Sequence, residues 1–448
     1  MILTILGGGG FRVPLVYGAL LRDTAEPRVD QVVLHDVDEE RLLAISMVLD
    51  AMGAGHERPP KVRATTNLDD ALRDAAFVFS AIRVGGLEGR TADERVALDL
   101  GLLGQETTGP GGIAYGLRTV PVAVHIAQRI AAVCPDAWVI NFTNPAGMIT
   151  EAMQGVLGER VIGICDTPIG LARRAGRALG LEPDVTAPDY VGLNHLGWLR
   201  GLSHQGRDVL PDLIGNQQLL TGIEEGRLFG TEWIGDLGAI PNEYLYYYYY
   251  TREAVASIRG AADTRGEFLL RQQGAFYAET ARVPATAFEQ WQRVRRERDA
   301  TYMAESRHDA TEERDPADIE GGGYEGVALA LISAISRGQR STMILNVRNG
   351  STVPGLPAHA VVEVPCAVDA DGAHPLATRP LVSHQLGLVQ QVKAVEQLTI
   401  QAAATGSVRT AVKALALHPL VDSVSTAQIL LEGYRSRIPS LDKVFRRS

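Results

Sequence analysis

Near the N-terminus lies a stretch of residues suited to holding a phosphate group. Four successive glycines follow the apolar run 2–6: Gly7, Gly8, Gly9 and Gly10. Glycine lets backbone amides approach a pyrophosphate closely, and the N-terminus of a following helix adds favourable partial charge. Pro14 stands where the first turn of such a helix tolerates proline. The pattern predicts a dinucleotide cradle that also includes Phe11.

An acidic residue follows the next apolar run and suggests which dinucleotide the cradle would take. Asp36 stands 29 residues beyond Gly7. A carboxylate at this place can accept hydrogen bonds from a ribose diol and would repel a 2'-phosphate, which favours NAD over NADP. Arg12 occupies the position of the third glycine of the GxGxxG pattern. A plain tight turn in an α/β protein is therefore the alternative interpretation.

The elements around this turn follow the rhythm of a parallel sheet with crossover helices. Six β-branched or apolar runs predict strands: Ile2–Leu6, Gln31–His35, Lys61–Thr66, Phe77–Ile82, Trp138–Phe142 and Val161–Ile164. Asp38 opens a run with an acidic first turn and helical spacing of its apolar residues, which predicts a helix. We expect residues 1–166 to form a Rossmann-type, NAD-binding domain.

The pattern changes in the second half of the chain. Strands are expected at Tyr190–Leu193, Thr342–Asn346 and Ala360–Val364, and a long helix at Ala285–His308. The last 65 or so residues predict apolar helices that pack on the first domain or on a sister subunit. Residues 167–448 are thus expected to form an α+β C-terminal domain, so that the chain as a whole is α/β with a domain order similar to lactate and malate dehydrogenases.

Several further stretches resemble glycoside hydrolase family 4, and together they cover nearly the whole chain. They are RVGGLEGRTADE (83–94), GLLGQETTGPGG (101–112), NFTNPAG (141–147), ICDTP (164–168), GLNHLGW (192–198), IPNEYLYYYY (240–249) and VRNG followed by VVEVP (347–365). The family is an exception to the usual pair of glycosidase carboxylates. The resemblance implies that NAD takes a hydride from C3 of a sugar, after which C2 is deprotonated, the C1 substituent is eliminated, water adds and the hydride returns.

The resemblance also implies a divalent metal, because negative charge develops on the sugar oxygens. Cys165 and His195 match the family's metal ligands, and manganese is the ion that the resemblance suggests. Two protein ligands leave positions open for sugar hydroxyls and water, as in a catalytic site. A thiolate is a soft partner for manganese, so other divalent ions stay open. Taken alone, the two residues read as a buried cysteine and a hydrogen-bonded core histidine.

Three residues match catalytic positions of the family. Tyr244 matches the base that removes the C2 proton, although the run Tyr246 to Tyr250 offers neighbouring rings if the register differs. A free tyrosine has a pKa of about 10, so such a base needs help, and Glu106 matches the residue that raises its basicity. Asp166 matches the proton donor to the leaving group in phospho-α-glucosidase members, with a helix N-cap as the alternative.

Arg90, Asn144 and Arg265 match substrate-contacting positions. A sugar 6-phosphate is a dianion that guanidinium groups hold well, whereas surface ion pairing is the ordinary role of an arginine. Asp263 lies close to Arg265 in the sequence and could orient Tyr244 or that arginine.

The preferred hypothesis is a 6-phospho-β-glucosidase, because most of the matching stretches look closer to that branch. A 6-phospho-α-glucosidase or a non-phosphorylated glycosidase of the same mechanism is the runner-up. A 2-hydroxyacid dehydrogenase is the rival of another class, although Cys165 would then have no purpose. A catalytically silent nucleotide-binding sensor is the third possibility.

Composition narrows the partners. With 43 Lys and Arg against 53 Asp and Glu, the formal net charge is −10, which argues against nucleic acid. Three cysteines without CxxC spacing argue against a disulfide framework and favour the cytoplasm. Neither a signal peptide nor a membrane span is expected. We expect a small-molecule sugar substrate and, from the resemblance, a homo-dimer or homo-tetramer.

Overall fold

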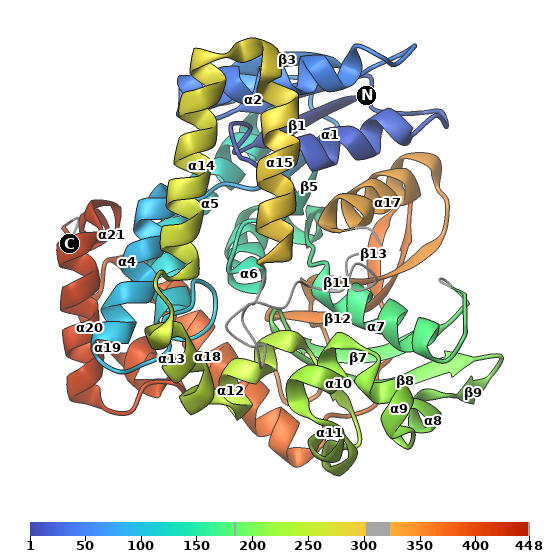
Figure 1. The fold of residues 1–448 in the computed structure, drawn as a ribbon, viewed down its shortest axis with the longest axis vertical. Coiled ribbons are helices and arrows are strands. Elements are labelled where there is room, and N and C mark those ends of the chain that lie inside the picture. The colour runs from blue at the N-terminus through green and yellow to red at the C-terminus, as the bar shows by residue number, and fades with distance from the viewer. Residues whose placement is uncertain (183–184, 302–322, 447–448) are drawn as a thin grey trace.

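A computed structural model describes residues 1–182, 185–301 and 323–446. The N-terminal half forms a six-stranded parallel sheet (Figure 1). Its strands are β1 (Ile2–Leu6), β2 (Gln31–His35), β3 (Lys61–Thr65), β4 (Phe77–Ser80), β5 (Trp138–Asn141) and β6 (Val161–Gly163). Their spatial order, β3-β2-β1-β4-β5-β6, is that of a Rossmann fold. The six predicted strands are confirmed within two residues at each end. Five of them are apolar runs buried on both faces, which leave little choice of conformation, and β3 at the sheet edge is partly exposed.

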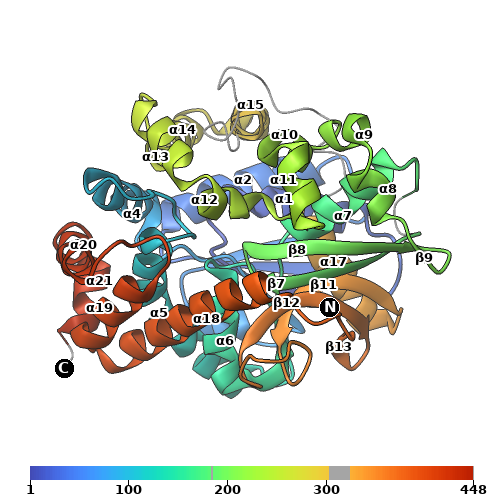
Figure 2. The same cartoon turned by 90° about the horizontal axis from the view of Figure 1, so that it is seen from below.

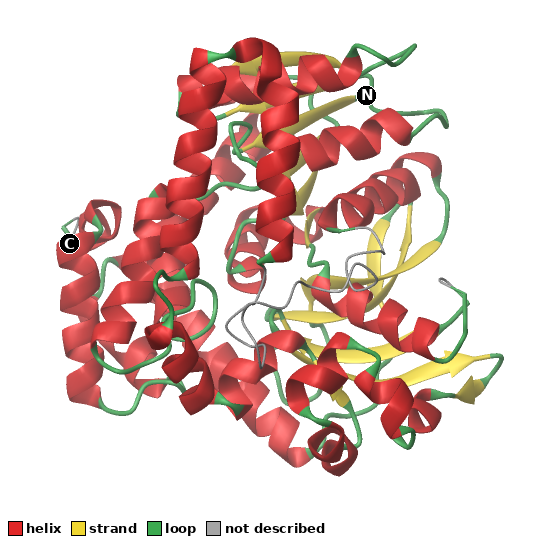
Figure 3. Cartoon of the chain, viewed as in Figure 1, coloured by secondary structure: helices red, strands yellow, loops and turns green. Residues whose placement is uncertain are grey.

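The second half extends the same sheet with antiparallel strands (Figure 3). They are β11 (Ser341–Arg348), β12 (Val361–Asp369), β7 (Ala187–Leu193), β8 (Leu196–His204) and β10 (Ile240–Pro241), with β13 (Gly372–Pro375) and β9 (Arg207–Asp208) at the side. Strand β11 joins β6 where Asn346 faces Gly163. The α/β class is confirmed, whereas the division of the chain after residue 166 stays a prediction.

Long helices cover the first half of the sheet. Helix α2 (Glu39–Gly53) begins where Asp38 caps it by accepting the backbone N–H of Arg41, as its acidic first turn indicated. Helix α14 (Arg265–Arg282) begins with a capping box between Thr264 and Glu267. Helix α15 (Ala287–Ala300) runs beside α14 and packs on α2 (Figure 1). The predicted helix Ala285–His308 therefore starts two residues later, and its residues 302–308 lie outside the described ranges.

The C-terminal helices lie against the first half of the chain. They are α18 (Ser383–Thr405), α19 (Val408–Leu417), α20 (Val424–Arg437) and α21 (Pro439–Phe445). They pack on α4 (Gly86–Asp99) and α5 (Pro110–Val133) (Figure 2). Leu117 and Val78 share one buried cluster with Leu430 and Tyr434. This arrangement confirms the expectation that these helices pack on the N-terminal part of the same chain.

The remaining helices and 3-10 turns complete the fold. They are α1 (Val13–Arg22), α3 (Leu68–Leu72), α6 (Ala146–Leu157), α7 (Thr167–Ala178), α8 (Leu210–Ile214), α9 (Gln217–Thr221), α10 (Glu224–Phe229), α11 (Thr231–Leu237), α12 (Tyr246–Tyr249), α13 (Thr251–Gly260), α17 (Tyr324–Arg337) and the 3-10 turns η1 (Gly158–Arg160), η2 (Glu243–Leu245) and η3 (Pro284–Thr286). Within the described ranges, no helix is both long and apolar enough to span a bilayer.

Candidate active site

A cavity of about 550 Å³ opens at the carboxyl ends of the parallel strands. Gly7 follows β1, Ala81 follows β4 and Cys165 lies just beyond β6, and all three line it. Strand order reverses between β1 and β4, and the crevice at such a switch point is where α/β sheets bind ligands. The cavity therefore lies where the fold itself favours a binding site.

The glycine turn forms one wall of this cavity. Gly7 has a φ of +80°, and a Cβ there would lie 2.5 Å from the carbonyl oxygen of Ala81, so only glycine fits. Gly7, Gly10 and Phe11 line the cavity, whereas Gly8 and Gly9 are not among its lining residues. Packing of Phe11 against Phe276 and Trp291 ties the turn to α14 and α15.

Asp36 holds the turn from behind. Its Oδ2 accepts the backbone N–H of Gly9 at 3.1 Å. The side chain is not among those lining the cavity, so its expected contact with a ribose stays a prediction.

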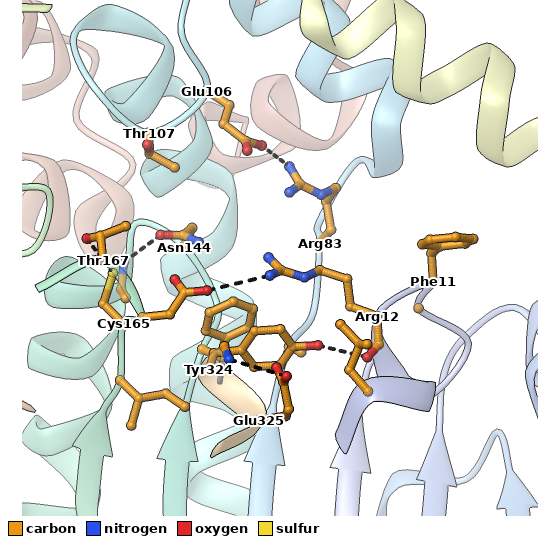
Figure 4. A pocket seen from close by; sticks show the side chains of 18 of the residues that line it. Phe11, Arg12, Arg83, Glu106, Thr107, Asn144, Cys165, Thr167, Tyr324 and Glu325 are labelled. Carbon is orange, nitrogen blue, oxygen red and sulfur yellow. Dashed lines mark hydrogen bonds and ion pairs between the residues drawn. The ribbon is translucent and has the colours of Figure 1, made fainter. Parts of the chain in front are cut away.

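Arg12, at the place of the third glycine, is accommodated because its side chain leaves the turn. The guanidinium lies 4.3 Å from the ring centroid of Tyr324, whose hydroxyl donates to the Arg12 carbonyl oxygen at 2.7 Å. It also approaches Asp166 Oδ2 to within 3.7 Å. Figure 4 shows Arg12 extending from the turn toward the wall that carries Cys165. From the sequence, Arg12 was only a departure from the GxGxxG pattern, and its position in the cavity was not predicted.

Cys165 and His195 come from separate strand ends and line the same cavity. His195 occupies the tight connection between β7 and β8 with a φ of +63°, a conformation that disfavours side chains. Burial raises the pKa of the Cys165 thiol, with Glu363 and Asp166 adding to the effect. Burial lowers the pKa of His195 to about 4, so its imidazole is neutral near pH 7.

This pair fits a catalytic divalent cation. A neutral imidazole can ligate directly, and a cation deprotonates a thiol that it binds. Within the described part of the chain, no cluster of three or more histidine, cysteine or carboxylate side chains is placed to hold a metal. A cation held by Cys165 and His195 would thus keep open positions for ligands from a substrate.

Tyr244 lies in η2 and stacks on His195, with ring centroids 3.7 Å apart. Asn242 fixes the start of this turn, since its Oδ1 accepts the Tyr244 backbone N–H at 3.0 Å. Tyr247 also lines the cavity. The other rings of the run have partners elsewhere: Tyr246 stacks on Tyr250, Tyr248 lies by His418, and Tyr249 accepts from Trp198. The structure thereby narrows the tyrosines at the cavity wall to Tyr244 and Tyr247 among residues 244–250.

Glu106 also lines the cavity and is held between two arginines. Its carboxylate oxygens accept from Arg83 at 2.5 Å and Arg90 at 2.7 Å (Figure 4 shows the first contact). Burial opposes ionisation of Glu106, but the two guanidinium groups outweigh it and lower the pKa to about 2. Arg90 also donates to Glu94 at 2.8 Å, so it is a buried, doubly paired residue rather than a surface ion pair.

Asp166 precedes α7 but makes no capping hydrogen bond with its side chain. Its carboxylate instead faces the Arg12 guanidinium at 3.7 Å, so the interpretation of this side chain as a helix cap is wrong. Asp263 binds Arg271 at 2.5 and 2.6 Å at the surface. The expectation that Asp263 orients Tyr244 or Arg265 is wrong as well, because Arg271, six residues beyond Arg265 on α14, takes its carboxylate.

The cavity is rich in arginine although the chain carries a net charge of −10. Arg265 donates to Thr301 Oγ1 at 2.6 Å and lines the cavity, as does Asn144 on the loop after β5. The Arg298 guanidinium also lines it and has no acceptor among the described residues. Burial and then the neighbouring cations Arg12 and Arg265 lower the pKa of Arg298 to about 9. Sequence reasoning missed this residue, because nothing in the arginine-rich run 293–298 distinguishes it.

The Arg298 guanidinium, which has no acceptor among the described residues and lies close to Arg12 and Arg265, indicates a site for an anion. A guanidinium held among others of like charge lowers its energy when a phosphate or carboxylate enters. The cavity thus combines a dinucleotide turn, a cysteine and histidine pair, a stacked tyrosine and an anion-attracting wall.

Comparisons with known proteins agree with this set of cavity residues. The model described as family 4 glycosyl hydrolase matches residues 2–181, and the model of the family 4 glycosyl hydrolase C-terminal domain matches residues 190–421. A probable 6-phospho-beta-glucosidase of Bacillus subtilis (strain 168) is 33% identical and covers 98% of this chain and 97% of its own. A maltose-6'-phosphate glucosidase of the same organism is 30% identical, with coverage of 96% and 94%.

A solved structure shows the same fold over nearly the full length. The 6-phospho-beta glucosidase from Thermotoga maritima, in a form with manganese, NAD+ and glucose-6-phosphate, has a TM-score of 0.81 and 28% identity. The match covers 97% of this chain and 98% of that protein.

Proposed function

Since the chain belongs to family 4 of the glycosyl hydrolases, we propose that it hydrolyses 6-phospho-β-glucosides with NAD and a divalent cation, manganese being the first candidate. The observation that carries the proposal is the meeting of the glycine turn, Cys165, His195 and Tyr244 around one cavity. These residues span positions 7 to 244 of the chain, and this chemistry gives all of them a purpose together. The Thermotoga maritima enzyme, crystallised with manganese, NAD+ and glucose-6-phosphate, supports the choice of ligands.

The proposed roles follow from the positions of the side chains. Bound NAD would supply a hydride acceptor for C3 of the sugar, and the cation a Lewis acid for its oxygens. Cys165 Sγ and His195 would hold the cation. The Tyr244 hydroxyl oxygen takes the C2 proton, and the Asp166 carboxyl gives a proton to the leaving-group oxygen. Gly7, Gly10 and Phe11 bind the dinucleotide, with Asp36 bracing the turn through Gly9.

Glu106 is proposed to raise the basicity of Tyr244. Its ion pairs with Arg83 and Arg90 hold it ionised, as this role requires. Arg90 is then a residue that shapes the cavity wall as well as one that can reach a substrate. Asn144 is proposed to contact the sugar hydroxyls from the loop after β5.

The 6-phosphate is assigned to Arg265 and Arg298. The guanidinium of Arg298, which has no acceptor among the described residues, would gain a counterion when a phosphate dianion enters, and Arg265 adds a second positive charge beside it. A non-phosphorylated glucoside would leave this charge uncompensated. Phosphate recognition is therefore the part of the proposal that the electrostatics of the cavity support most directly.

The 6-phospho-α-glucosides are the second candidate substrates. Asp166, rather than asparagine, follows Cys165, and the maltose-6'-phosphate glucosidase is nearly as similar to the chain as the β-enzyme. Elimination after C2 deprotonation does not depend on one anomeric geometry, so the same residues would act on either anomer.

The deciding experiment uses four nitrophenyl glucosides, α and β, each with and without a 6-phosphate. Assays run with NAD and Mn²⁺ together, with each alone, and after chelation. We expect turnover of the 6-phospho-β-glucoside only when both are present, without net NADH. Turnover of the α-anomer alone would reverse the anomer assignment, and net NADH from a 2-hydroxy acid would favour the dehydrogenase rival. A homo-oligomeric state and a cytoplasmic location stay predictions.

A further inference from the structure

Thr107 contacts His195 from the loop that precedes α5. The Thr107 Oγ1 lies 3.1 Å from His195 Nδ1, although the two residues are 88 positions apart. The ring of His195 is restrained twice, since Tyr244 stacks on its face and Thr107 meets its edge. Position alone leaves open which of the two atoms carries the hydrogen between them.

The neighbouring hydrogen bonds decide this. Gln105 Oε1 accepts the backbone N–H groups of Thr107 and Thr108, each at 2.6 Å, so this atom is the amide oxygen and not the nitrogen. The Thr107 hydroxyl lies 3.0 Å from the same oxygen. Two oxygens at that separation need a hydrogen between them, and Gln105 Oε1 has none to give. The single hydroxyl hydrogen of Thr107 is therefore donated to Gln105.

The Thr107 oxygen can then only accept from His195. We propose that Thr107, held by Gln105, sets the His195 tautomer with the proton on Nδ1, so that Nε2 is the one basic nitrogen and the metal ligand. Thr107 is thus a positioning residue that acts through His195. The opposite tautomer would protonate Nε2 and place two lone pairs against each other at Nδ1. The metal part of this inference rests on the proposed function, whereas the tautomer part rests on the hydrogen bonds alone.

The test measures Mn²⁺ affinity, by electron paramagnetic resonance of the unbound ion, in the presence of NAD. Thr107→Val removes the acceptor, and we expect the dissociation constant to rise about 10- to 100-fold, the usual effect of losing a residue that orients a ligand. Thr107→Ser restores the hydroxyl and should stay within about threefold of the wild type. Thr108→Val makes the same exchange one residue further along the loop and is the matched control.

A second measurement reads the tautomer directly. Two-bond ¹H–¹⁵N correlation spectra of histidine-labelled protein, with His195 identified by its loss in His195→Ala, should show the proton on Nδ1 in the wild type. A proton on Nε2 there would overturn the proposal. So would equal Mn²⁺ affinity of wild type and Thr107→Val while His195→Ala binds more weakly, or equal weakening in the valine and serine variants. If His195→Ala itself binds Mn²⁺ normally, the metal assignment under the proposed function fails instead, and the spectra still decide the tautomer.

Discussion

The ring of Tyr244 lies flat against the imidazole of His195, with centroids 3.7 Å apart and planes 10° apart. The stack places a phenol beside the histidine that is proposed to hold the cation. A nearby dication favours the deprotonated form of an acid, so a cation held by His195 would supply the positive charge that a tyrosine base near neutral pH needs. The proposed base, Tyr244, and the proposed metal ligand, His195, are separate residues, so mutations can test the two roles one at a time.

Tyr244→Phe keeps the stacked ring and removes only the hydroxyl. We expect kcat to fall about 10²- to 10⁴-fold because the proton acceptor is lost. Mn²⁺ affinity should stay unchanged, since the phenol is not proposed as a ligand. Exchange of the C2 hydrogen with deuterated solvent reports the step directly. Tyr247→Phe, on the same cavity wall, is the control, and a larger effect there would transfer the role to that residue.

Arg298→Met removes the guanidinium for which the described part of the chain provides no acceptor. We expect KM for the 6-phosphoglucoside to rise about 10- to 100-fold, the range for a lost charged hydrogen bond. The free energy of unfolding should not fall, because no ion pair of the described residues is broken. Steady-state kinetics and urea unfolding measure the two effects. Arg271→Met at the surface should leave KM unchanged; an unaltered KM in Arg298→Met would remove this residue from phosphate binding.

Gly7→Ala tests the cradle. The new Cβ would lie 2.5 Å from the Ala81 carbonyl oxygen at a φ of +80°. We expect a loss of about 2–4 kcal/mol in unfolding free energy together with a loss of NAD binding. Gly55→Ala meets nothing within 4 Å and should be neutral in both measurements. Normal NAD affinity in Gly7→Ala would contradict the assignment of the turn to the dinucleotide.

The backbone of His195 is strained because its φ is positive. An alanine at this position would keep the strain, and a glycine would relieve it. At a φ of +63°, His195→Gly should be more stable than His195→Ala by about 1 kcal/mol, the reverse of the usual order of these two residues. Urea unfolding of both variants measures the difference. An alanine variant as stable as the glycine variant would show that the turn relaxes.

Glu106 should make stability depend on acid pH. Its pKa of about 2 lies below the ordinary value, so its contribution is complete above the unfolded pKa and disappears as pH falls through the folded one. The unfolding free-energy difference between wild type and Glu106→Gln should be constant above about pH 6 and shrink as pH falls from about 4.5 toward 2. A difference that does not change with pH would show that the ion pairs do not persist in solution.

The parallel sheet could be predicted from the sequence because β-branched runs alternate with helical patterns, and each strand boundary follows from local chemistry. The shared cavity wall of His195 and Cys165 was expected only from the family resemblance and not from local patterns, since it depends on antiparallel strands that extend the sheet from the far half of the chain. Residue types alone also failed to separate Arg298 from its neighbours, or to show that Asp263 would bind Arg271. Both outcomes depend on which partner the folded chain brings within reach.

One hydrogen-bonded sheet passes beneath the whole cavity, because β11 pairs with β6 at Asn346 and Gly163. The halves that supply the glycine turn and the histidine therefore share a continuous sheet, joined at β6 and β11 by this residue pair. We expect a hinge motion between the two halves to disturb that pairing. The spacing between the glycine turn and His195 is then expected to be set largely by the sheet, so that ligands would have to match it.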